Sequence, residues 1–162
     1  MRRAKAARFF TRRVLTLNTF PPLIRLSGHS PNQDAKAAGV GIIVGGELYG
    51  QGSSREAAVM GPMHLGVRAV IAKSFARIHR ANLVNWGLVP LVFDDPNDWD
   101  GLERDDRLRL DGLRAALAAG SGITITNMRS GARFTASCVL TSRERDILLA
   151  GGVLAHTRGA SA

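Results

Sequence analysis

The sequence predicts a mixed α/β domain, and three observations lead to that fold class. Short β-branched apolar runs, such as "VGIIVGG" and "LVPLVF", have the length of buried strands. Stretches of helical character separate these runs, and two alternating segments flank Arg129-Ser130-Gly131 as in a β-hairpin. Three strands alternating with two helices, followed by a hairpin and a helix, make a mixed sheet covered by helices.

The first predicted strand covers residues 40–46, where "VGIIVGG" ends in glycines. A loop rich in glycine and serine follows. We then expect a helix over residues 55–66, weakened or ended at Gly61-Pro62, because proline lacks the N–H that a helix interior needs. Residues 67–74, "VRAVIAKS", predict the second strand.

The second predicted helix covers residues 75–87 and ends at Gly87. Phe75, Ile78 and Leu83 lie at roughly helical spacing along it. The third strand, "LVPLVF", follows at residues 88–93.

The second half begins with an acidic stretch at residues 94–106, which we interpret as a surface loop. Residues 108–120 predict a turn and a short helix, and the hairpin comes next. Thr141 and Glu144 have the spacing of a capping box, so a last helix is expected from there to Gly151-Gly152.

The net charge of +9 is concentrated at the start of the chain. Seven of the 22 basic residues precede the first acidic residue, Asp34, and the other 15 face 13 acidic residues. We therefore separate a basic, poorly ordered segment at residues 1–37 from a nearly neutral domain at residues 38–162. The basic segment has the pattern of a transit peptide over residues 1–20, of an arm for polyanions, or of poorly selected leader sequence.

The apolar runs and the cysteine count limit the cellular compartments that we expect for this protein. No apolar run approaches the roughly 18 residues of a membrane helix. The chain has one cysteine, Cys138, which can form no internal disulfide and hold no metal by itself. We expect a cytoplasmic protein, or a mitochondrial matrix protein if residues 1–20 are a transit peptide.

The stretch "GQGSSRE" supports two interpretations. Ser53 and Glu56 have capping-box spacing, so the serine could simply cap the helix that follows. Alternatively, free N–H groups at that helix start, the hydroxyls of Ser53 and Ser54, and the guanidinium of Arg55 could bind a carboxylate or phosphate. The stretch lacks the lysine of a phosphate-binding P-loop and the second glycine of a nucleophile elbow.

Other candidate residues favour structural roles. His79 could be a ligand or an acid–base group, but a histidine among apolar and basic residues is more often structural. His29 and His64 lack partners at metal-binding spacing. The acidic stretch could bind a divalent cation, but such a loop is usually only solvated; its aspartates are Asp94, Asp95, Asp98 and Asp100.

Two long motifs, "GIIVGGELYGQGSSRE" and "LGVRAVIAKSFARIHRANLVNWGLVPLVF", resemble the C-terminal swivelling domain of the aconitase family. The resemblance extends from about Val40 to the end of the chain. The second motif is closer to aconitase than to the small subunit of isopropylmalate isomerase. The resemblance implies a mixed-sheet swivelling β/β/α domain of the aconitase C-terminal type.

The resemblance also implies a hydro-lyase that interconverts citrate and isocitrate through cis-aconitate, an activity of the tricarboxylic acid cycle. Ser53 would be the catalytic base, and Ser54 and Arg55 would bind substrate carboxyl groups. A four-iron four-sulfur (4Fe-4S) cluster would be held by another chain or domain, since Cys138 alone cannot hold it. The expected partner is an aconitase-type large subunit or cluster-bearing domains, without which this chain would be inactive.

The sequence departs from the family pattern at several points. Ala57 replaces the histidine of the usual "SSREHA". An opening strand with a "DDISTDHI"-like motif and an upstream substrate-binding arginine are missing. The alternative function is therefore a catalytically dead or truncated domain that binds RNA or another polyanion through its basic segment, although nucleic acid is not the favoured partner. In that case, deleting residues 1–33 should abolish salt-sensitive binding and leave the fold intact.

Overall fold

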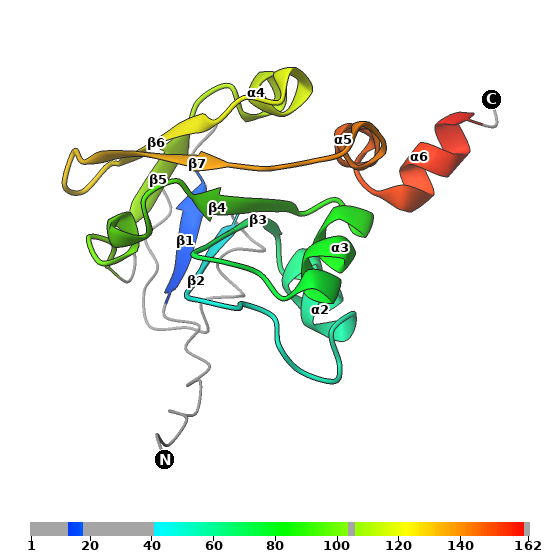
Figure 1. The fold of residues 1–162 in the computed structure, drawn as a ribbon, viewed down its shortest axis with the longest axis horizontal. Helices are drawn as coiled ribbons and strands as arrows, with labels where there is room; N and C mark the ends of the chain where they lie inside the picture. Colours follow the sequence, from blue (N-terminus) through cyan, green and yellow to red (C-terminus); the bar gives the residue numbers. More distant parts are fainter. Residues whose placement is uncertain (1–12, 18–40, 104–105, 161–162) are drawn as a thin grey trace, which may run out of the picture.

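The computed structural model describes residues 13–17, 41–103 and 106–160, which form a mixed α/β domain (Figure 1). Seven strands in these ranges close into one sheet in the order β1-β2-β3-β4-β7-β6-β5. The strands are β1 (Arg13–Leu17), β2 (Gly41–Gly45), β3 (Val67–Ala72), β4 (Val89–Phe93), β5 (Arg107–Leu110), β6 (Ile123–Asn127) and β7 (Arg133–Ser137).

The predicted helices are present, and the structure adds a short 3-10 helix in the acidic stretch and a last helix near the end of the described residues. The helical elements are α2 (Ala57–His64), α3 (Arg77–Asn85), the 3-10 helix η1 (Pro96–Trp99), α4 (Leu113–Ala119), α5 (Ser142–Ala150) and α6 (Val153–Ala160). Figure 1 shows α2, α3, α5 and α6 gathered at one side of the sheet, where α3 contacts the other three. The sequence analysis did not predict α6.

The three strands that the β-branched runs predicted, β2, β3 and β4, are parallel neighbours in the sheet. Alternate residues of β2 enter different cores: Ile42 and Val44 join the larger cluster with β5, β6 and β7, and Ile43 joins a smaller cluster. That smaller cluster contains Val59 of α2 and Leu83 of α3. Burial on both faces fixes the loops that leave β2 and β3 in space.

Gly61-Pro62 does not end the first helix, so that half of the prediction was wrong. Helix α2 passes through Pro62 and reaches His64. Proline removes one donor, but its carbonyl still accepts. The N–H of Leu65 donates to the carbonyls of both Gly61 and Pro62, at 3.1 Å each, and closes the last turn.

The second half of the chain contains one strand that was not predicted. Residues 107–110, expected to be part of a loop and a turn, form β5, with Leu108 and Leu110 buried. The hairpin of β6 and β7 is confirmed, and so is the capping box of α5. Thr141 Oγ1 accepts from the N–H of Glu144 at 3.2 Å, and Glu144 Oε2 accepts from the N–H of Thr141 at 2.9 Å.

Strand β1 lies inside the segment that the sequence analysis set apart as basic and poorly ordered. It pairs antiparallel with β2 and parallel with β5, and so closes the sheet. The sheet therefore begins before residue 38, and deleting residues 1–33 would remove one of its strands. The other residues of that segment, which include most of the predicted transit peptide, lie outside the described residues.

Candidate functional site

The two loops that follow β2 and β3 meet at one edge of the sheet. The first, which we call the glycine loop, consists of residues 46–55; the second runs from Lys73 to Ala76. Because β2 and β3 are parallel neighbours, both loops leave the same edge. The N–H of Tyr49 donates to the carbonyl of Ser74, and the N–H of Ala76 donates to the carbonyl of Tyr49, at 2.9 Å each.

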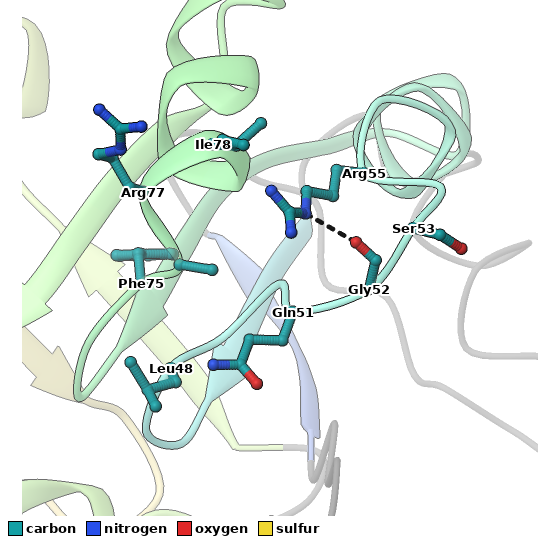
Figure 2. A pocket seen from close by; sticks show the side chains of 9 residues that line it. Leu48, Gln51, Gly52, Ser53, Arg55, Phe75, Arg77 and Ile78 are labelled. Carbon is teal, nitrogen blue, oxygen red and sulfur yellow. Dashed lines mark hydrogen bonds between the residues drawn. The ribbon is translucent and has the colours of Figure 1, made fainter.

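A hollow of about 690 Å³ lies between the glycine loop and the start of α3 (Figure 2). Its lining contains two arginines and no carboxylate; the lining residues are Leu48, Gln51, Gly52, Ser53, Arg55, Phe75, Ala76, Arg77 and Ile78. No side chain caps α3, and the first N–H groups of a helix have no partner within it. This chemistry suits an anion.

The position of Arg55 is set by its own loop. Its Nε donates to the carbonyl of Gly52 at 2.7 Å, and Figure 2 shows the guanidinium between the loop and Ile78. The two terminal nitrogens form no hydrogen bond with the described residues, so they can make the pair of parallel bonds that a carboxylate accepts.

The two serines are placed differently. Ser53 lines the hollow, but its hydroxyl points away from Arg55 in Figure 2. Ser54 does not line the hollow, and its carbonyl accepts from the N–H of Ala58 at 3.1 Å. Both side chains are exposed. The structure thus brings Ser53 and Arg55 to one hollow, with Ser54 beside it.

The structure contradicts the capping interpretation of Ser53. Helix α2 begins after Glu56, and no side chain caps it. Some of the N–H groups at this helix start have partners: those of Val59 and Met60 donate to the carbonyl of Glu56, at 2.9 and 3.0 Å. The start of α3, beside the hollow, has no side-chain cap either.

Sequence reasoning missed the contribution of the second loop. Phe75 lies before α3, not inside it, and forms a β-bridge with Tyr49. Ile78, expected to pack along the helix, is 47% exposed at the hollow. Arg77 supplies the second cation of the lining. The signal that could have found these residues was the pair of parallel strands, whose following loops must meet.

The residues of this chain do not fit an iron–sulfur cluster. Such a cluster needs several thiolates, and Cys138 is the one cysteine of the sequence. Burial raises the pKa of its thiol to about 11. The charge of nearby Arg80 lowers this pKa, but by less than burial raises it. Within the described ranges no three side chains of His, Cys, Asp or Glu gather as metal ligands.

Two aspartates of the acidic stretch have structural partners. Asp94 Oδ1 accepts from the hydroxyl of Ser137 at 2.6 Å, and Asp95 Oδ1 accepts from the N–H of Asn97 at 2.9 Å. Asp95 thereby caps η1. These two carboxylates have structural roles.

Comparison with known proteins identifies the domain. The profile of the aconitase C-terminal domain matches residues 31–96. These residues include both loops of the hollow and the strands that carry them. The chain contains an aconitase C-terminal domain.

Relatives of this aconitase C-terminal domain are considerably longer proteins. A probable mitochondrial aconitate hydratase of Dictyostelium discoideum is 46% identical over 105 residues, which are 63% of this chain and 14% of that protein. The mitochondrial aconitate hydratase of Saccharomyces cerevisiae is 49% identical over 84 residues, or 52% and 11% of the two chains.

A solved structure supports the fold of this aconitase C-terminal domain. The crystal structure of 3-isopropylmalate dehydratase from Methanocaldococcus jannaschii aligns with a TM-score of 0.61 and 33% sequence identity. The alignment covers 74% of this chain and 64% of that chain. The predicted α/β fold with a mixed sheet is confirmed.

Proposed function

We propose that this chain is the swivel domain or small subunit of an aconitase-type hydro-lyase that interconverts citrate and isocitrate through cis-aconitate. The observation that carries the proposal is the convergence of the two motif segments on one hollow with Arg55 and Arg77 and no carboxylate. The negative charge of a tricarboxylate is complementary to these two positive side chains. The names of the most similar relatives favour a mitochondrial location over the cytoplasmic expectation.

In this proposal Arg55 binds a substrate carboxylate through its two terminal nitrogens, while Nε stays on the Gly52 carbonyl. Ser54 adds a hydroxyl contact. Ser53 is the base that removes the proton next to a carboxylate. A serine acts as a base only where cations and N–H groups stabilise its alkoxide, so its hydroxyl must turn toward the arginines before reaction.

The remaining catalytic groups are proposed to lie on an aconitase-type large subunit or on cluster-bearing domains. The 4Fe-4S cluster that the family resemblance implies would belong there, since the single Cys138 cannot hold it. Alone, this chain would bind substrate without converting it.

The test is reconstitution with a cluster-containing large subunit and an assay of citrate-to-isocitrate conversion. We expect Ser53→Ala to lower kcat by about 10²–10⁴ and Arg55→Gln mainly to raise KM. The control is Ser130→Ala, at the exposed hairpin turn, which should behave as wild type. Activity that does not depend on Ser53 would reject the assigned role.

A further inference from the structure

His79 is a buried histidine to which the proposed function gives no task. It lies on α3 and is 1% exposed. Neither Nδ1 nor Nε2 forms a hydrogen bond of normal geometry with the described residues. Buried polar side chains are nearly always hydrogen-bonded, so two unpaired ring nitrogens require an explanation.

The imidazole lies directly against the glycine loop. A Cβ atom on Gly50 would lie 2.1 Å from Cγ of His79, so no other residue fits at position 50 without displacing the ring. The ring of Tyr49 meets the imidazole edge to face, with centroids 5.3 Å apart. His79 therefore contacts the loop that carries Ser53 and Arg55.

The backbone of Arg55 lies close enough to the imidazole to influence the pKa of His79. Burial lowers the pKa of His79, and the Arg55 backbone partly opposes that effect. A group that raises the pKa of a histidine stabilises a ring N–H, so it is an acceptor, here the carbonyl oxygen. In this structure that interaction falls short of a regular hydrogen bond.

We propose that His79 is a positioning residue: when the glycine loop closes on a carboxylate, a ring N–H donates to the backbone carbonyl of Arg55. That bond fixes the backbone from which the guanidinium of Arg55 reaches the ligand. A neutral imidazole suffices, because either tautomer carries one N–H. The inference rests on the proposed function for its carboxylate ligand.

The test measures binding of tricarballylate, a tricarboxylate without a hydroxyl group, to the full chain by calorimetry. His79→Phe keeps the ring packing but removes the donor, so we expect about tenfold weaker binding. The melting temperature should stay equal or rise, because two unpaired buried atoms disappear. His79→Gln, which supplies an N–H, should restore part of the affinity, and His156→Phe is the control.

Two results would overturn the proposal. In one, His79→Phe binds tricarballylate as the wild type does. In the other, affinity and melting temperature fall together and His79→Gln restores neither, which is the behaviour of a packing residue.

If the wild type itself does not bind tricarballylate, the proposed ligand fails, and ¹⁵N relaxation of the ligand-free chain still tests His79. We then expect lower order parameters for the amides of residues 51–55 in His79→Phe than in the wild type. Equal order parameters would reject the link between His79 and the loop.

Discussion

The glycine loop and the turn of the β6–β7 hairpin are two polar connections that use their side chains in opposite ways. In the turn, Asn127 Oδ1 accepts from the N–H of Arg129 at 2.9 Å, and its Nδ2 donates to Asp106 at 2.6 Å. Arg129 also donates to Asp106, and Asp106 accepts from the N–H of Glu103 at 2.8 Å. Asp106 and Asn127 are fully buried within this network.

In the glycine loop, Arg55 bonds to its own loop at Gly52, and the hydroxyls of Ser53 and Ser54 are exposed. The turn thus uses its polar groups to stabilise the fold, whereas the loop leaves its serine hydroxyls exposed, as the proposed ligand binding requires. The difference teaches that composition alone does not separate the two uses, because both connections contain glycine, serine and arginine. Four predictions test this comparison.

The largest effect is expected for Asp106→Ala. This change removes the carboxylate that holds Asn127 and Arg129, and breaking such a buried network costs about 3 kcal/mol in the free energy of unfolding. Urea denaturation measures the loss. Asp111→Ala is the matched control: it removes an exposed ion pair with Arg109 and should cost less than about 1 kcal/mol. Tricarballylate binding should stay unchanged in both variants.

Gly50→Ala should cost about 2 kcal/mol more than Gly131→Ala. Both glycines have positive φ, 88° and 72°, so the backbone strain is similar. A Cβ at position 50 meets the ring of His79, whereas a Cβ at position 131 meets nothing within 4 Å. Thermal denaturation of both variants checks the difference. Equal losses would mean that the contact between loop and His79 contributes nothing.

Acid should lower the free energy of unfolding through the hairpin turn, because the turn depends on the ionised carboxylate of Asp106. Burial opposes ionisation of Asp106, but bonds from Arg129, Glu103 and Asn127 outweigh it and hold its pKa below the usual value. The stability from this carboxylate is present above pH 3.8, its ordinary pKa, and is lost as pH falls through the lower folded value. The loss should be smaller than in Asp106→Ala. Asp106→Asn should flatten the dependence in denaturation curves between pH 2 and 5, and an unchanged slope would contradict this.

The smallest effect on stability is expected for Ser53→Ala and Ser54→Ala, within about 0.5 kcal/mol. Neither hydroxyl supports the described fold, so unfolding curves should match the wild type. A large loss of stability in either variant would show that the serine is structural. In the same proteins, weaker tricarballylate binding by Ser54→Ala would support its proposed contact.

The sequence allowed the strands β2, β3 and β4, the hairpin and the capping box to be predicted, because each depends on a local pattern. It misplaced the end of the first helix, because a Pro62 near the last turn removes one donor only. It missed β5, whose four residues "RLRL" are too short for a clear alternation. The sequence also did not predict the hydrogen bonds of Asp106, which matched a solvated acidic residue. Its partners Asn127 and Arg129 are distant in the sequence and meet it only in the fold.

For the site, the first loop was identified from its own residues and its family resemblance. The second loop was not, because Phe75 and Arg77 matched a helical pattern when considered alone. Their position at the hollow depends on the pairing of β2 with β3, a contact between segments about 25 residues apart. The roles of Ser53, Ser54 and Arg55 remain predictions for the experiments above.

Strand β1 closes the sheet, because it pairs with both β2 and β5. Proteolytic trimming up to residue 12 would spare this strand, whereas trimming past Leu17 would leave one edge of β2 and one edge of β5 without a neighbour. Unpaired edges are templates for aggregation. Preparations shortened within residues 13–17 should therefore self-associate. A protease that removes a leader, during import or purification, must cut before Arg13 to keep the strand.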